Sequence, residues 1–174
     1  GSDGIAFATT PVFTNIVLSN VNDGPRLGVL TDTTGSEGSF FSRTLSIGDP
    51  DPEGHQITVV WGDGSANSVF STSSAAPQIQ HIYADNGNYT VSVTVNDQQG
   101  QPNSSESTSF NVAVANVAPT IGMSGGTTVE QGQVYTLDLG NPNDPGADTV
   151  DQYTINWGDG SAPEVYAAAA LPAN

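Results

Sequence analysis

The sequence predicts an all-β protein made of two-sheet sandwiches in tandem, one of them complete and the flanking ones partial. Composition is the first observation behind this fold class: valine leads the apolar residues, and 20 glycines and 11 prolines among 174 residues supply turns between short strands. The second is a repeat, because the hexapeptide Trp-Gly-Asp-Gly-Ser-Ala occurs at residues 61–66 and again at residues 157–162. Since a fixed spacing indicates repeated structural units, we expect each unit to be one sandwich.

A second pair of landmarks sets the boundaries of these units. The pattern Asn-x-x-Pro occurs at residues 22–25 and again at residues 116–119. Upstream of each copy lies an aspartate at the same distance, Asp3 before the first and Asp97 before the second. The sequence therefore predicts the last strand of a preceding unit at residues 1–21, a complete unit at residues 22–115, and the first part of a further unit at residues 116–174.

Apolar residues at every second position predict the strands of the complete unit, because this period buries one face of a strand. In chain order, the runs are Phe41, Leu45 and Ile47; Ile57, Val59 and Trp61; Tyr89, Val91, Val93 and Val95; and Phe110, Val112 and Val114. Arg43 is an unexpected charge within the first run. A turn at Gly62-Asp63-Gly64 closes the second run, and the polar residues 98–109 predict a solvated turn. About seven short strands in such a unit fit a two-sheet sandwich.

The charge balance excludes several classes of function. Two arginines, no lysine and 18 acidic residues give a formal net charge of −16. Such a surface cannot neutralise a run of phosphates, so we expect no nucleic-acid partner, and it is not attracted to anionic lipid. No apolar run approaches the roughly 20 residues of a spanning helix, and residues 1–20 lack the pattern of a signal peptide. We therefore expect no direct membrane insertion. Without cysteine, no disulfide stabilises the fold.

Several motifs, in this order along the complete unit, resemble those of the PKD (polycystic kidney disease) repeat family of immunoglobulin-like sandwich modules. They are Asn22-x-x-Pro25, Asp49-Pro50-Asp51-Pro52-Glu53-Gly54, Trp61-Gly62-Asp63-Gly64, His81-x-Tyr83, Gly87-Asn88-Tyr89-Thr90-Val91 and Asp97-x-x-Gly100. The family usually has two residues between the tryptophan and Gly-Asp-Gly, whereas here they are adjacent. The resemblance implies seven-stranded immunoglobulin-like sandwiches with Trp61 in the core. Tyr89 matches a tyrosine corner, in which the phenol bonds to upstream backbone.

The resemblance also implies a calcium site at one pole of the complete unit. Calcium-dependent members of the family use positions that match Asn22, a backbone carbonyl near Asp23, Asp49, Asp51 and Asp97. Ca²⁺ takes about six to eight oxygen ligands, which carboxylates, amides and carbonyls supply. The alternative is that these residues only cap turns. Asn116, Asn141 and Asn143 mark a weaker second site, and Asp3 is the remnant of the site in the preceding unit.

Catalytic patterns are weak, so we expect the protein not to be an enzyme. A nucleophilic triad needs a histidine beside a serine and a carboxylate. There are two histidines: His55 sits in the Asp49–Gly54 loop, and His81 matches the family's strand position before Tyr83, so we expect both to be structural. Their spacing is not that of a two-histidine metal site.

These observations together predict a non-catalytic extracellular segment, secreted or on a cell surface, that spaces or adheres. Calcium bound near Asn22 and Asn116 would rigidify the joints between repeats. Its partners would be neighbouring repeats of the same protein and a protein or polysaccharide surface ligand. Two alternatives remain open: an accessory carbohydrate- or protein-binding module of a large secreted hydrolase, and a subunit of a head-to-tail extracellular filament.

Overall fold

In the part of the chain that the structure describes, the regular elements are β-strands, in agreement with the predicted all-β class. The computed structural model describes residues 21–51 and 53–168. The strand predicted at residues 1–21, with Asp3, lies outside the described residues except for Val21. In the described part of the chain, no helix has the length and apolar character needed to cross a membrane.

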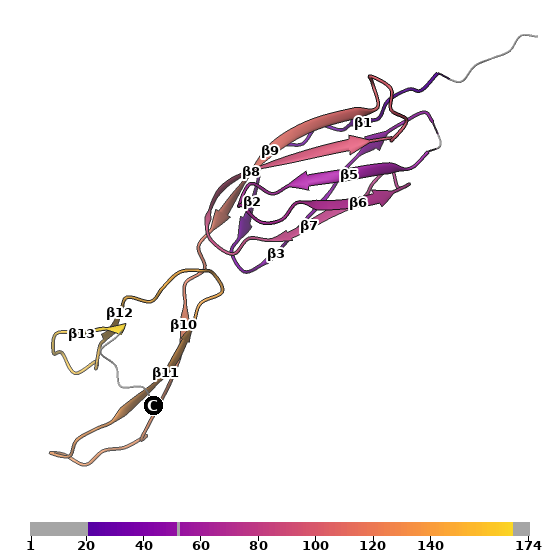
Figure 1. Cartoon of the computed structure of the whole chain (residues 1–174). Coiled ribbons are helices and arrows are strands. Elements are labelled where there is room, and N and C mark those ends of the chain that lie inside the picture. Colours follow the sequence, from indigo (N-terminus) through magenta and orange to yellow (C-terminus); the bar gives the residue numbers. More distant parts are fainter. Residues whose placement is uncertain (1–20, 52, 169–174) are drawn as a thin grey trace, which may run out of the picture.

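The strands fall into two groups along the chain (Figure 1). The first group is β1 (Arg26–Leu27), β2 (Thr33–Ser36), β3 (Phe40–Thr44), β4 (Ile47–Gly48), β5 (His55–Val60), β6 (Ser68–Thr72), β7 (Gln78–Ile82), β8 (Gly87–Asn96) and β9 (Ser105–Ala115). The second group is β10 (Thr120–Gly125), β11 (Leu137–Asn143), β12 (Gln152–Ile155) and β13 (Glu164–Ala167).

The first group forms a sandwich of two sheets (Figure 1). The larger sheet has five strands in the order β2-β9-β8-β5-β6, and the smaller sheet pairs β3 with β7. Within the larger sheet, β2 runs parallel to β9, whereas the other pairs are antiparallel. These two sheets account for the predicted seven strands, and β1 with β4 adds a short antiparallel pair. Because β2 and β9 are parallel, both finish at the same end of the sheet, and the chain continues from there to β10.

The predicted apolar faces meet between the two sheets and form the core. The buried apolar residues are Phe41, Leu45, Ile47, Ile57, Val59, Trp61, Ile79, Tyr83, Val91, Val93, Val95, Phe110, Val112 and Val114. Trp61 is 1% exposed, and its indole Nε1 donates to Ser68 Oγ at 3.0 Å. The indole also stacks on the ring of His81, with 4.5 Å between the ring centroids. The prediction that Trp61 belongs to the core is therefore confirmed.

The first predicted run, from Phe41 to Ile47, is divided between two strands. β3 ends at Thr44, and the backbone amides of Leu45 and Ile47 donate to the carbonyls of Pro77 and Ala75, both at 2.8 Å. These two hydrogen bonds extend the pairing of β3 with β7 to the residues just before β7, as far as the first residue of β4. The charge within this run is accommodated because the guanidinium of Arg43 lies 4.2 Å from the centroid of the Phe110 ring, a cation–π contact.

The solvated turn predicted at residues 98–109 is wrong in its second half. β9 begins at Ser105, and its polar first half pairs with β8 from Asn96↔Ser105 onward. Backbone hydrogen bonds form this ladder whatever the side chains are, so a polar sequence on a partly exposed face can still be a strand.

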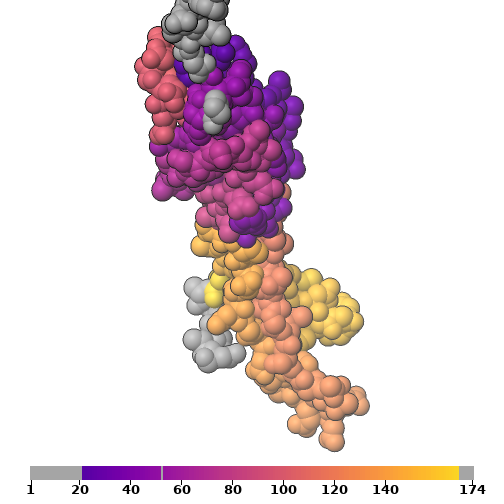
Figure 2. Space-filling view, turned by 90° about the vertical axis from the view of Figure 1, so that its right-hand side faces the viewer, coloured from indigo at the N-terminus to yellow at the C-terminus, as the bar shows by residue number. Residues whose placement is uncertain are grey.

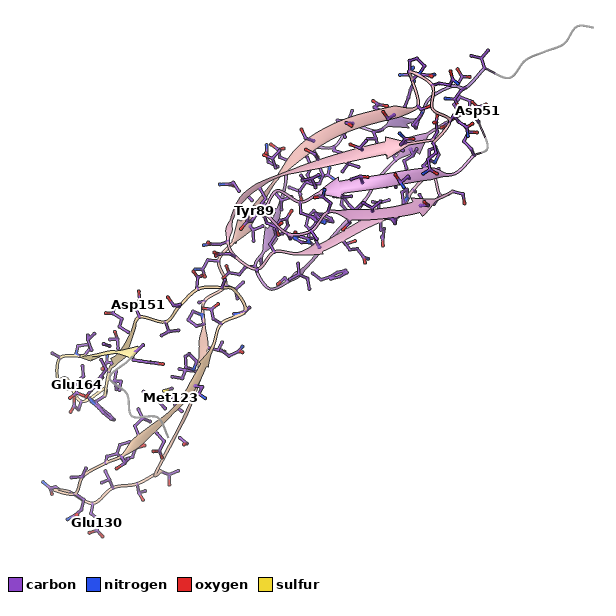
Figure 3. The ribbon with its side chains drawn as sticks, viewed as in Figure 1. Asp51, Tyr89, Met123, Glu130, Asp151 and Glu164 are labelled. Atoms are coloured by element: carbon purple, nitrogen blue, oxygen red, sulfur yellow. The ribbon has the colours of Figure 1, made fainter. Side chains whose placement is uncertain are left out.

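The tyrosine corner predicted at Tyr89 is present. The Tyr89 hydroxyl donates to the backbone carbonyl of Asp85 at 2.9 Å and lies 3.2 Å from that of Asn86. The Tyr89 ring stacks on Tyr83, with centroids 4.6 Å apart. This corner fixes the start of β8 at the end of the sandwich that faces the second group of strands (Figure 3).

The second group, residues 116–168, forms two antiparallel pairs, β10–β11 and β12–β13. An open apolar hollow of about 850 Å³ separates them, lined among others by Tyr135, Leu139, Tyr153 and Trp157. Trp157 is 40% exposed and meets the edge of Tyr135 at a centroid distance of 6.2 Å.

The two copies of the hexapeptide nevertheless fold into the same turn. The φ angles are +83° and +82° at Gly62 and Gly64, and +75° and +87° at Gly158 and Gly160. In both copies the aspartate Oδ1 accepts the backbone N–H two residues on, at 3.0 Å in the first turn and 2.9 Å in the second. Glycine is required here because L side chains rarely adopt positive φ. The tandem boundaries themselves stay a prediction.

Replacing Tyr89 with phenylalanine tests the tyrosine corner. The change removes one hydroxyl donor and leaves the stacked ring in place, so we expect the free energy of unfolding to fall by about 0.5–1.5 kcal/mol. Urea denaturation followed by circular dichroism measures this difference.

The matched control is Tyr166→Phe, because that hydroxyl donates to the exposed carboxylate of Glu164. We expect no measurable change in this variant. Equal effects in the two variants would contradict a structural role for the corner.

Candidate functional site

Three carboxylates gather at the pole of the sandwich where the described chain begins. Asp49 and Glu53 come from the loop between β4 and β5, and Asp97 directly follows β8. Each offers one oxygen within 4.8 Å of the others, and we call this group the N-terminal pole cluster. Asp51, in the same loop, marks this pole in Figure 3, at the end opposite Tyr89.

Local backbone bonds shape the loop that carries this cluster. The Asp51 amide donates to Asp49 Oδ1 at 3.0 Å, a bond by which an aspartate stabilises its own turn. The turn-capping alternative is therefore part of what these residues do. Asp51 in turn accepts the Asp23 amide on Oδ2 at 2.8 Å. The side chain of Asp51 thus binds the backbone of the incoming chain at Asp23.

Asn22 ties the incoming chain to the buried member of the cluster. Its side-chain Nδ2 donates to Asp97 Oδ2 at 2.7 Å, and Asn103 Nδ2 donates to the Asn22 carbonyl at 2.8 Å. Residues from three separate segments therefore meet at Asp97.

Asp97 is 1% exposed, yet its surroundings favour the carboxylate form. Burial raises its pKa, but hydrogen bonds from the Gln99 amide, Asn22 and Ser104, together with the nearby His55, outweigh burial and lower the pKa below its ordinary value. Asp97 therefore stays ionised.

The two histidines both pair with aspartates. His55 Nε2 lies 2.9 Å from Asp49 Oδ2, while its buried Nδ1 has no hydrogen-bond partner. His81 Nε2 lies 2.6 Å from Asp63 Oδ2, and its ring stacks on Trp61. Burial opposes ionisation of Asp63, but hydrogen bonds from Ser65 and His81 outweigh it and lower the pKa of Asp63. His55 thus pairs with a loop aspartate, and His81 pairs with a turn aspartate and packs on the core tryptophan.

The structure brings together Asn22, Asp49 and Asp97 among the five residues predicted for the first site. Asp23 and Asp51 bond to each other beside the cluster, and Glu53 joins it although the sequence analysis did not select it. Its position as the third acid of Asp49-Pro-Asp-Pro-Glu53 was the available signal, because a short loop can direct several of its acids to one side.

A second acidic group lies where the sandwich meets residues 116–168. Glu37 follows β2, and Asp144 and Asp148 lie in the segment between β11 and β12. One oxygen of each lies within 4.8 Å of the others, and we call this group the junction cluster. Asn116 contacts this cluster, since its Nδ2 donates to Asp148 Oδ2 at 3.1 Å; its role at a metal site stays a prediction.

Asn141 and Asn143, predicted beside Asn116, lie on β11, and Asn143 directly precedes Asp144. The carbonyl of Asn143 instead accepts the Thr120 hydroxyl at 3.3 Å. The carboxylates crowd one another in the junction cluster: burial, followed by the charges of Glu37, Asp85 and Asp144, raises the pKa of Asp148. No sequence spacing links Glu37 to Asp144 or Asp148, so sequence reasoning missed this cluster.

The lowered pKa of Asp97 predicts an acid-sensitive fold. Because the unfolded chain binds this proton more readily than the folded chain, the stability contributed by Asp97 is present above the ordinary pKa of 3.8 and is lost as the pH falls through the lower folded value. We expect the free energy of unfolding, measured with urea in EDTA, to fall from about pH 4 toward pH 2.

In the Asp97→Asn variant, the free energy of unfolding should change less with pH in that window. The control is Asp138→Asn, at an exposed position, which should keep the full pH dependence. An unchanged slope in Asp97→Asn would contradict the role of Asp97.

Comparison with known proteins identifies the family. No curated protein sequence matches the chain. The PKD domain of an M14-like peptidase from Thermoplasmatales archaeon SCGC AB-540-F20 is 20% identical, with a TM-score of 0.41, over 54% of this chain and 98% of that chain. The PKD domain of the human VPS10 domain-containing receptor SorCS2 is 18% identical, with a TM-score of 0.37, over 66% and 94%. The family model of the PKD domain matches residues 22–112, more than half of the sequence. The chain therefore belongs to the PKD domain family.

Proposed function

We propose that the chain is a non-catalytic segment of an extracellular tandem-repeat protein, which spaces or adheres, and that calcium rigidifies its joints. Membership of the PKD domain family supports a module of this kind. The strongly acidic composition without lysine or cysteine agrees with a saline, calcium-bearing exterior. Its partners in this proposal are neighbouring repeats and a protein or polysaccharide surface.

The N-terminal pole cluster is the single observation that carries the calcium proposal. Its donors are carboxylate oxygens, the ligands that hard divalent cations prefer, and Ca²⁺ binds them at roughly 2.3–2.6 Å. Two ligands of one such ion lie at most about 5 Å apart, and the three carboxylates satisfy this limit. The donor set therefore fits calcium, with Asp49, Glu53 and Asp97 as ligands.

Asn22 and Asp51 supply the mechanical consequence. Asn22 donates to Asp97, and Asp51 accepts the Asp23 amide, so both hold the incoming chain against the pole. A bound cation would offset the repulsion among the three carboxylates and make this attachment more stable. Motion of the incoming chain relative to the sandwich would then be reduced.

Calcium should raise the melting temperature of the protein. Extracellular calcium modules bind with dissociation constants of about 10⁻⁴–10⁻³ M. At about 10 mM Ca²⁺, binding to the folded state alone stabilises by roughly 1.4–2.7 kcal/mol, which corresponds to a rise of about 3–11 °C for a chain of this length. Differential scanning calorimetry in EDTA and in CaCl₂ measures this rise.

Glu53→Gln should lose most of the rise attributed to the N-terminal pole. Because Glu53 is only half-buried, we expect this variant to fold. The exposed control Glu130→Gln, which makes the same change in charge, should keep the rise. If Glu53→Gln and Glu130→Gln respond to calcium alike, the N-terminal pole cluster does not bind it.

A further inference from the structure

Glu37 is a buried acid with an unpaired oxygen. Its side chain is 0% exposed, although it immediately follows a strand that ends at the edge of the sheet. Oε1 accepts the Val117 amide at 2.6 Å, whereas Oε2 is buried without a hydrogen-bond partner. A buried charged group is costly unless it is paired, so the unpartnered oxygen indicates a missing ligand.

The segment between β11 and β12 wraps closely around this carboxylate. A Cβ added to Gly146 would lie 2.5 Å from Glu37 Cδ, so no side chain fits at that position without displacing the acid. The Gly146 amide donates to Asp144 Oδ1 at 2.9 Å, which turns the segment at this point. Beside it, a Cβ on Gly38 would meet the Pro145 carbonyl oxygen at 2.4 Å. Figure 2 shows the orange C-terminal part abutting the end of the indigo and purple sandwich.

The chain has no cationic side chain to pair with these acids. Its two basic residues are Arg26 and Arg43. Arg43 lies over Phe110 and donates to the Thr31 carbonyl at 2.6 Å. Arg26 lies in β1, at the other end of the sandwich (Figure 1). Both histidines pair with aspartates elsewhere. The arginines and histidines of this sequence therefore supply no counter-charge to the junction cluster.

We propose that Glu37, Asp144 and Asp148 bind one Ca²⁺ ion across the junction between the sandwich and residues 116–168, with Asn116 positioning Asp148. The three oxygens lie close enough to share an ion that binds at roughly 2.3–2.6 Å. Calcium accepts an irregular carboxylate-rich site, whereas Mg²⁺ demands near-ideal octahedral geometry and retains several waters. This inference deepens the proposed function and rests on it for the stiffening role.

The junction cluster differs from the N-terminal pole cluster in how its oxygens are satisfied. At the N-terminal pole, both oxygens of Asp49 and both of Asp97 already face a donor of the protein. At the junction, by contrast, Glu37 Oε2 is buried without a hydrogen-bond partner. Because Glu37 belongs to the sandwich and its partner acids to residues 116–168, a shared ion cross-links two parts of the chain.

Isothermal titration calorimetry of the whole chain, first freed of metal with EDTA and then titrated with CaCl₂, tests the proposal. The variant Glu37→Gln should lose one binding event, or weaken it at least tenfold, and Asp148→Asn, an exposed position, should do the same. Glu130→Gln is the control, because this residue lies at the far tip of the β10–β11 hairpin (Figure 3) and the change in charge is identical.

The outcomes at the two clusters are distinguishable. Calcium binding by Glu37→Gln that equals that of Glu130→Gln overturns the junction site. Loss of binding in Glu53→Gln and not in Glu37→Gln also overturns it, while leaving the proposed site at the N-terminal pole intact. Loss only in Glu37→Gln supports the junction site and overturns the N-terminal one. Titration with MgCl₂ alone should give at least tenfold weaker binding at the junction, and equal affinity overturns the assignment to calcium.

Stability and geometry give two further readouts. In EDTA, Glu37→Gln should melt at or above the temperature of the unmodified protein, because an unpaired buried charge is removed, and this order should reverse in CaCl₂.

The chain lacks cysteine, so spin labels on Ser71→Cys and Thr128→Cys report one distance across the junction. Calcium should narrow that distance distribution in the Glu130→Gln background and not in Glu37→Gln. A distribution unaffected by calcium in both backgrounds overturns the cross-link.

Discussion

Burial of the Trp61 indole between the two sheets is the constraint on which the rest of the sandwich depends. Trp61 directly follows β5 of the larger sheet. Its indole stacks on His81 and meets the edge of Phe41, so it contacts both strands of the smaller sheet. Tyr83 meets Phe41 edge-on and stacks on Tyr89, which continues the aromatic contacts to the pole next to residues 116–168. Burial, followed by the nearby charge of Asp63, raises the pKa of Tyr83 to about 12, so the phenol stays neutral in the core.

Comparison of the two tryptophans separates local from tertiary effects. The Trp-Gly-Asp-Gly-Ser-Ala copies fold into the same turn because glycine φ angles and the aspartate bond act within a few residues. Burial differs nonetheless: Trp61 is 1% exposed and Trp157 is 40% exposed. Trp61 has a second sheet to pack against, whereas Trp157 borders an open hollow in the described part of the chain. The same local sequence therefore contributes very different apolar burial, and hence stability, in its two settings.

Charge is distributed unequally between the two poles of the sandwich. With a net charge of −16 and two arginines, the chain must place most of its acids without a basic partner. At the N-terminal pole, His55, the Asn22 amide and backbone N–H groups supply hydrogen bonds, so Asp97 remains ionised at little cost. At the junction, burial, followed by the charges of the neighbouring acids, raises the pKa of Asp148. The junction is thus the place where a solution cation would change the energy most.

The sequence by itself determined the strands with alternating apolar residues, the Gly-Asp-Gly turns, the corner at Tyr89 and the approach of Asn22 to Asp97. These features depend on neighbours within a few residues or on the order of family motifs. Tertiary structure alone decided three others: the polar start of β9, the place of Arg43 over Phe110, and the junction cluster. Because β2 pairs in parallel with β9, Glu37 lies beside the end of β9, where the chain passes to residues 116–168. There it lies close to acids that are far away in sequence. Proximity of this kind follows from strand pairing and packing, which no local pattern encodes.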